Sequence, residues 1–191
     1  MTLLEPQALA TLLSNVTEKR AFCVAYSGGV DSHVLLHLLS RAAECLPCSI
    51  RAVYIHHGLS PRATLWEAHC KSVCHGLGLS FESHAVTVSQ ASGDSIEASA
   101  RTARYSQFSS LLSSDEVLLT AHHGDDQLET VLLQLLRGSG CKGLSAMPPR
   151  RVFPSGLVCL RPFLGVLRSS IMSYAQLHQL QWVEDESNQS L

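Results

Sequence analysis

Charge and long hydrophobic runs are both scarce in this 191-residue sequence. Charged residues make up 16% of it, against about 25% in an average globular domain, while hydrophobic residues make up 46%. This composition excludes a disordered tail and a highly charged coiled coil. Apolar runs such as residues 34–39 and 131–136 stop at about six residues, far short of the ~20 that a membrane-spanning helix needs. The sequence therefore predicts a globular domain with no membrane segment.

An export signal and a paired cysteine pattern are also missing. The N-terminus has no basic start and carries Glu5, unlike a secretory signal peptide. Seven cysteines are an odd number without a repeated spacing, so we expect free thiols in a reducing cytoplasm. Cys45 and Cys48 form a CxxC pair of the kind that serves redox or metal chemistry, but no second pair follows, and buried thiols are the favoured interpretation.

Acidic residues are absent from residues 130–183. Six of the 14 basic residues lie in this window, which leaves eight basic residues against all 16 acidic residues elsewhere; the six are Arg137, Lys142, Arg150, Arg151, Arg161 and Arg168. Such polarity suggests that one face of the domain meets a polyanion. A solvated basic face without a partner is the alternative, because low overall charge makes an acid-free stretch less unusual.

Short apolar segments alternate with helical periodicity along most of the chain. We expect strands at 21–26, 50–55, 80–86 and 116–121, and helices at 3–18, 31–44, 61–77, 95–112, 125–136 and 166–180. Such alternation is typical of right-handed βαβ crossovers. We therefore predict a single doubly wound α/β domain with a mostly parallel, five-stranded sheet flanked by helices. Residues 138–164, which are punctuated by Gly and Pro, are expected to be an irregular excursion.

The loop SGGVDS, residues 27–32, lies between the first expected strand and its helix. Its two glycines permit a tight turn and a close approach to a ligand, and the N–H groups of a helix start, with the hydroxyls of Ser27 and Ser32, can cradle a phosphate. The loop itself contains neither the P-loop motif GxxxxGK[ST] nor the dinucleotide-binding motif GxGxxG, which disfavours both of these sites. Asp31 fits beside phosphates only with a divalent cation, which makes it a candidate Mg²⁺ ligand. An ordinary βα turn with Asp31 as helix cap is the alternative.

SGGVDS resembles the pyrophosphate-binding loop of the N-type ATP pyrophosphatases. Members of that superfamily split ATP between its α- and β-phosphates, release pyrophosphate and leave an adenylylated intermediate. The resemblance implies that Ser27, Gly28, Gly29, Val30, Asp31 and Ser32 bind ATP.

A second polar segment, TAHHGDDQLET, follows the fourth expected strand and opens a helix at residues 120–130. Because strand carboxyl ends share one crevice in a doubly wound sheet, this segment should face SGGVDS. The carboxylates of Asp125, Asp126 and Glu129 lie within one helical turn and can converge on a metal or a cationic substrate. For Asp125 and Asp126, a favourable interaction with the helix dipole is the alternative.

AHHGDDQLET closely resembles the HxxDDQxET motif of the tRNA(Ile)-lysidine synthetases, and further segments agree in order at residues 56–60, 95–105, 137–140, 161–164 and 182–188. The resemblance implies an ATP- and Mg²⁺-dependent ligase that joins L-lysine to the wobble cytidine of a tRNA(Ile) with a CAU anticodon. It implies that cytidine is adenylylated at C2 and that the lysine amine then displaces AMP. Asp31, Arg104, Asp126 and Glu129 would be catalytic, Asp31, Asp125 and Asp126 would hold the metal, and His57 would lie near the adenine.

Several alternatives remain open at this point. Arg101 is equally consistent with an ion pair to Glu97. A 2-thiolation enzyme would share the loop, although its loop usually reads SGGKDS where this chain has Val30. A nucleotide-binding module without catalysis is a third reading.

The charge asymmetry adds an expectation about RNA. We predict that Arg150 and Arg151 contact the RNA backbone, with Arg137 or Lys142 closer to the crevice. Lysidine synthetases continue past the SN motif into tRNA-binding domains, so residues 1–191 are expected to form the catalytic domain alone. The sequence does not determine the oligomeric state, and a homodimer is one of the alternatives.

Overall fold

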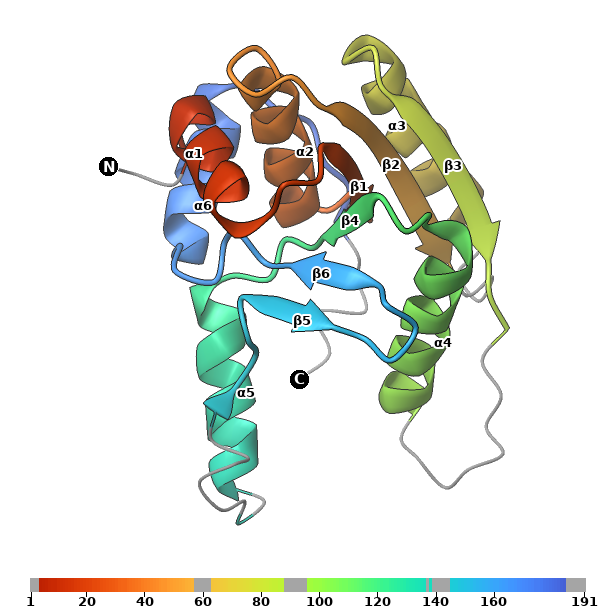
Figure 1. Ribbon diagram of the computed structural model, residues 1–191, viewed down its shortest axis with the longest axis vertical. Helices are drawn as coiled ribbons and strands as arrows, with labels where there is room; N and C mark the ends of the chain where they lie inside the picture. The colour runs from red at the N-terminus through yellow and green to blue at the C-terminus, as the bar shows by residue number, and fades with distance from the viewer. Residues whose placement is uncertain (1–3, 57–62, 88–95, 137, 139–144, 185–191) are drawn as a thin grey trace.

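The computed structural model describes residues 4–56, 63–87, 96–136, 138 and 145–184, and it contains one mixed sheet with helices on both faces (Figure 1). The strand order is β3-β2-β1-β4-β6-β5. All neighbouring strands are parallel except β5, which pairs antiparallel with β6 at the edge. The strands are β1 Ala21–Ala25, β2 Ser49–His56, β3 Ser80–Ala85, β4 Glu116–Leu119, β5 Arg150–Val152 and β6 Val158–Leu160.

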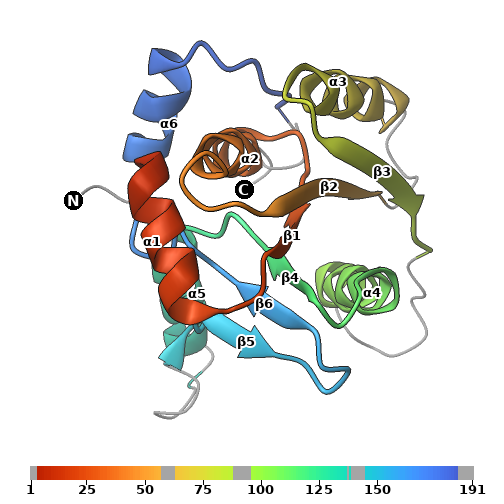
Figure 2. The ribbon, with the colours of Figure 1, turned by 45° about the horizontal axis from the view of Figure 1, so that its top comes forward.

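The described residues contain six helices, of which α1 precedes the first strand and the others connect or follow the strands: α1 Pro6–Val16, α2 Val30–Ala42, α3 Ala63–Gly76, α4 Ile96–Leu111, α5 Gly124–Leu136 and α6 Arg168–Leu177. Figure 2 shows α1, α2, α3 and α6 on one face of the sheet and α4 on the other. This arrangement confirms the predicted doubly wound, mostly parallel α/β fold, and each expected helix and strand is present with bounds shifted by a few residues. No helix in the described part of the chain is long and apolar enough to cross a membrane.

The predicted strand number was wrong: the sheet has six strands rather than five. The difference lies in residues 138–164, where β5 and β6 form a hairpin in place of the expected irregular excursion. Each of these strands has only three residues, and all three residues of β5 are exposed. Short strands without apolar alternation give no period-2 signal, which explains why the sequence pattern did not reveal them.

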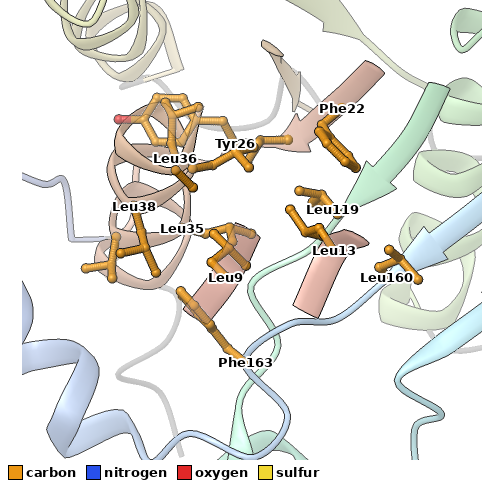
Figure 3. Close-up of a cluster of buried hydrophobic side chains, with 14 of the residues drawn as sticks. Leu9, Leu13, Phe22, Tyr26, Leu35, Leu36, Leu38, Leu119, Leu160 and Phe163 are labelled. Carbon is orange, nitrogen blue, oxygen red and sulfur yellow. The ribbon is translucent and has the colours of Figure 1, made fainter. Parts of the chain in front are cut away.

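The core divides into two clusters because strand side chains alternate between the two faces of the sheet. Phe22 and Val24 of β1 point into the larger cluster, where α1, α2 and α6 pack, and Figure 3 shows part of this cluster. Cys23, between them, points into a smaller cluster that includes Phe108 of α4. The central strand is therefore buried on both faces, as its uninterrupted apolar sequence indicates.

Helix α5 differs from the other helices because none of its residues is buried. It extends away from the sheet at the bottom of Figure 1. Its apolar residues follow the expected helical spacing, yet Leu128, Leu132 and Leu136 are 60%, 50% and 85% exposed. The residues that the structure describes do not cover this apolar face.

Candidate active site

The two polar segments meet at the topological switch point of the sheet. β1 lies between β2 and β4. After β1 the chain continues toward the β3 edge of the sheet, and after β4 it continues toward the β5 edge. In such sheets the crevice for ligands opens between the carboxyl ends of these two strands. The loop 27–32 follows β1, and residues 120–126 follow β4. Their predicted proximity is therefore confirmed, and residue contacts described below define it.

Gly28 is required by both backbone geometry and space. Its φ is +82°, a left-handed conformation that residues with a side chain rarely adopt. A Cβ atom at this position would also lie 2.9 Å from Cys70 Sγ and 2.9 Å from a methyl group of Val183. The loop thus turns tightly over α3 and over the segment that follows α6.

The two hydroxyls of the loop have different surroundings. Ser32 is buried, and its Oγ donates a hydrogen bond to the Gly29 carbonyl at 3.0 Å and accepts one from the Ser27 N–H at 3.2 Å. Ser27 is exposed, with its Oγ 3.1 Å from Ser32 Oγ. Ser32 therefore holds the loop from within, whereas the Ser27 side chain is exposed to solvent. The assignment of both residues as nucleotide ligands stays a prediction.

Helix α2 begins directly at this loop, with Gly29 as its N-cap and no side chain capping it. The N–H groups of the first helical turn have no partner within the helix, and the helix dipole places partial positive charge there. Val30 is buried, so it can contribute to this site only through its backbone. The start of α2 is consequently suited to an anion such as a phosphate.

His123 is the residue that joins the two segments. Its Nε2 lies 3.7 Å from Asp31 Oδ1, and its Nδ1 lies 3.7 Å from Asp125 Oδ2 and 3.6 Å from Asp126 Oδ2. The pKa of His123 is raised, chiefly by its interaction with Asp31. Burial lowers this pKa in part, and the negative charges of Asp126 and Asp125 raise it further. His123 is itself buried. A nearly enclosed imidazole thus lies among the three carboxylates expected to bind metal.

Asp125 and Asp126 also serve the start of α5. Asp126 Oδ2 accepts a hydrogen bond from the His123 N–H at 2.8 Å, a reciprocal arrangement that caps the helix. Asp125 Oδ2 accepts one from the Arg168 N–H at 2.8 Å and so ties α5 to the start of α6. Glu129 is exposed one turn along the helix. Asp126 therefore does cap the helix, through Oδ2, and its other carboxylate oxygen is left for other ligands.

The carboxylates fit a magnesium ion that is shared with phosphates rather than one held by protein alone. Asp31 Oδ1 is a buried oxygen that makes no hydrogen bond to the described residues. In the described ranges, no group of three or more His, Cys, Asp or Glu side chains is arranged to hold a metal ion by itself. Mg²⁺ typically binds one or two carboxylates and completes its shell with water and phosphate oxygens. Asp31 and Asp126 carry carboxylate oxygens of the kind that such a site needs, and their assignment as Mg²⁺ ligands stays a prediction.

A second group of residues surrounds His122, on the side of α4. Burial, together with the positive charges of Arg161, Arg101 and Arg104, lowers the pKa of His122 to about 4, so the ring is neutral at pH 7. Its Nδ1 lies 2.8 Å from Thr120 Oγ1. Arg104, predicted to be catalytic, therefore lies near the carboxyl end of β4, together with two further guanidinium groups.

Arg161 was counted among the surface cations, and this interpretation was wrong. It is only 2% exposed and follows β6 directly. It donates to the Pro148 carbonyl at 2.8 Å and to Tyr105 Oη at 3.4 Å, and its Nε has no hydrogen-bond partner among the described residues. A buried, incompletely paired cation at a strand carboxyl end is a candidate site residue. Its place in the RPFL segment was the only sequence signal for it.

The remaining predicted residues divide by location. Arg150 and Arg151 are exposed on β5, as expected from their position after two prolines. His57, Arg137 and Lys142 lie outside the described residues. Cys70 and Cys74 are buried as expected, but the expectation of burial was wrong for Cys45, which is exposed, and Cys48 is half-buried. All six cysteines that the structure describes are free.

A loop suited to phosphate binding at the switch point of such a sheet is typical of a known class of domain. A family model described as the PP-loop domain matches residues 3–191, and the chain belongs to that family. Membership implies that the domain uses ATP. Among individual proteins, the chain is similar to the tRNA(Ile)-lysidine synthase of Coxiella burnetii (49% identity over 97% of the chain and 41% of that protein) and to that of Pseudomonas aeruginosa (52% identity over 90% of the chain and 38% of that protein). The chain thus spans about two-fifths of the length of these relatives.

Solved structures show the same fold at low sequence identity. The U34-tRNA thiolase NcsA from Methanococcus maripaludis matches 91% of this chain and 62% of its own with a TM-score of 0.71 and 17% identity. The NH3-dependent NAD synthetase from Campylobacter jejuni matches 92% of this chain and 71% of its own with a TM-score of 0.60 and 16% identity. These matches support the architecture alone.

Proposed function

We propose that this chain is the catalytic domain of a tRNA(Ile)-lysidine synthase. The observation that carries the proposal is the pairing of the PP-loop with an acidic helix start through His123, in a chain about half identical to curated lysidine synthases. The substrates are then ATP, L-lysine and a tRNA(Ile) with a CAU anticodon, and the reaction takes place in the cytoplasm.

Two displacements make up the proposed reaction. The C2 oxygen of the wobble cytidine attacks the α-phosphorus of ATP, the bond to the β-phosphate bridging oxygen breaks, and pyrophosphate leaves. The uncharged side-chain amine of lysine then attacks C2, the C2–O bond breaks, AMP leaves, and the amine loses its second proton. ATP supplies the activation, so no oxidant or reductant is needed.

The chain's own residues have distinct roles in this proposal. The start of α2, with Ser27, binds the departing pyrophosphate through backbone N–H groups. Asp31 and Asp126 hold Mg²⁺, which supplies charge neutralisation between the phosphates when bound. Arg104 stabilises charge that develops at the α-phosphate. Asp125 and Glu129, both exposed at the start of α5, provide negative charge for the cationic lysine.

We further propose that basic residues outside the crevice hold the tRNA. Arg150 and Arg151 contact the RNA backbone from the edge strand β5, where both are exposed. RNA binding by Arg137 or Lys142 and nucleotide binding by His57 stay predictions, because these residues lie outside the described ranges.

Incorporation of radiolabelled lysine into a tRNA(Ile) transcript with a CAU anticodon tests this function. The matched control is the same transcript with the wobble cytidine replaced by uridine. Label in the cytidine transcript alone, with one AMP released per lysine incorporated, is the expected result. ATP binding without lysine incorporation would instead indicate a nucleotide-binding module, and transfer of sulfur to the tRNA would indicate a thiolation enzyme.

A further inference from the structure

Four side chains from α4 and the β5–β6 hairpin form a continuous row in which two neighbouring rings lie between two cations. Arg151 lies over the ring of Phe153, with its Cζ 4.4 Å from the ring centroid. The Phe153 and Tyr105 rings follow, 4.8 Å apart and tilted by 30°. Arg101 then lies over the Tyr105 ring at 5.6 Å. We call these four residues the arginine–aromatic strip.

The strip has a firm base and an open outer side. Tyr105 and Phe153 are half-buried and pack against the smaller core cluster, whereas Arg101 and Arg151 are exposed. A hydrogen bond of 3.0 Å from Ser155 to Ser109 fixes the hairpin to α4. Each guanidinium group therefore packs with one face against a ring and exposes its other face to solvent.

One end of the strip reaches the active crevice. Tyr105 Oη accepts a hydrogen bond from the buried Arg161, which follows β6 at the crevice side of the sheet. Arg101 is also near enough to His122 to affect its pKa. The other end lies at the free edge of the sheet, since β5 is the last strand.

From this arrangement we infer that the arginine–aromatic strip binds a single-stranded segment of RNA and directs it toward the crevice; this inference rests on the proposed tRNA substrate. Unpaired bases stack on aromatic rings and on guanidinium planes, while the same guanidinium groups neutralise backbone phosphates. A strip that combines both features suits an RNA loop better than a duplex, whose bases are already stacked. It also suits RNA better than an acidic peptide, which offers charge without bases.

Strand alternation provides a matched control on the same hairpin. Arg151 and Phe153 are two residues apart and share one side of the hairpin, whereas the intervening pattern places Arg150 on the opposite side. Arg150 and Arg151 are both exposed and carry the same charge. Arg150 thus reports general electrostatic attraction, and Arg151 reports the strip.

The test measures binding of a single-stranded RNA heptamer and of an RNA duplex as a function of salt concentration, without ATP or lysine. Arg151→Gln should flatten the salt slope for the heptamer by about 0.7 and also reduce the affinity extrapolated to 1 M salt by about tenfold. Phe153→Leu retains apolar volume and should reduce only the extrapolated affinity, by about fivefold. Arg150→Gln should change only the slope. Duplex affinity at 1 M salt should be the same in all three variants.

Two results would overturn the inference. One is an unchanged affinity at 1 M salt in both Arg151→Gln and Phe153→Leu. The other is an equal loss for the heptamer and the duplex, which would reduce the strip to a basic surface. Thermal unfolding of each variant checks that the substitution, above all Phe153→Leu, leaves the fold intact. Because the assay involves no chemistry, RNA binding by the strip together with absent lysine incorporation would reject the proposed function alone.

Discussion

The backbone N–H of Val183 donates a hydrogen bond of 3.0 Å to the carbonyl oxygen of Gly28. This bond joins the segment after α6 to the middle of the PP-loop, more than 150 residues earlier in the chain. A methyl group of Val183 also occupies the space that a side chain at position 28 would need. The segment after α6 thus supports the loop.

Val183→Pro tests whether this support matters for nucleotide binding. Proline removes the N–H donor, so the loop loses a hydrogen bond, and we expect ATP affinity to fall by about five- to tenfold, equivalent to roughly 1 kcal/mol. Val183→Ala keeps the donor and is the matched control, with affinity expected within about twofold of the original. Calorimetric titration with ATP measures both. Equal affinities in the two variants would show that the loop holds its shape without this bond.

A pair of glycine substitutions separates backbone strain from lack of space. Gly28 and Gly156 have similar φ values of +82° and +85°, but only Gly28 has atoms within 4 Å of the position of a Cβ. Gly156→Ala should cost about 1 kcal/mol of unfolding free energy from strain alone. Gly28→Ala should cost at least about 2 kcal/mol because the new methyl also displaces Cys70 or Val183. Urea unfolding measures both, and equal costs would mean that the contacts around Gly28 yield without penalty.

The acidic helix start gives a prediction about catalysis. Asp126→Asn keeps a side-chain acceptor for the His123 N–H, so helix capping and stability should remain close to the original. Loss of the charge should still slow tRNA-dependent ATP cleavage by about 10²-fold or more. Single-turnover measurement of AMP formation checks this result. A normal rate with normal stability would limit Asp126 to the cap.

Acid should weaken the fold through an ion-pair network far from the crevice. Arg51 of β2 bonds to Glu116 of β4 and to Glu82 of β3, and its hydrogen bond holds the pKa of Glu116 below the usual range. A carboxylate with a depressed pKa stabilises the fold above its ordinary pKa of about 4.3, and this contribution disappears as the pH falls through the lowered value. We therefore expect the unfolding free energy to decrease below about pH 4.

Glu116→Gln isolates the contribution of this carboxylate. At pH 7 the variant should lose about 2 kcal/mol, and its stability should fall less steeply with acid than that of the original chain. Glu82→Gln is the control, because the Glu82 side chain is 44% exposed against 13% for Glu116, and it should lose less. Urea unfolding between pH 3 and pH 7 provides the comparison. Parallel pH profiles for the original chain and Glu116→Gln would contradict the role of this pair.

The sequence was sufficient for the parts of the fold that have strong local signals. β1 is apolar and buried on both faces. The loop after it contains Gly28, where a left-handed backbone and close neighbouring atoms leave no room for a side chain. The carboxyl ends of β1 and β4 then meet because of the topology, so the proximity of the two polar segments could be predicted without any knowledge of side-chain contacts.

Features that depend on tertiary contacts could not be predicted in this way. Arg161 reads as a surface cation, and its burial against Tyr105 becomes visible only when β6 is placed beside β4. Ser32 looks equivalent to Ser27, yet the turn of the loop directs its hydroxyl inward. The support of Gly28 by Val183 joins two distant segments through a backbone group, which no residue type can signal.

The most direct test of the account is the release of pyrophosphate from ATP in the presence of tRNA(Ile) transcripts with cytidine or uridine at the wobble position. The site at the switch point should release pyrophosphate, and no inorganic phosphate, with the cytidine transcript only. Asp31→Asn should abolish this release while the chain stays folded at the assay temperature, because the variant loses the charge that faces His123 but no hydrogen bond of Asp31 Oδ1 to the described residues. Release that is independent of the wobble base, or that persists in Asp31→Asn, would contradict the account.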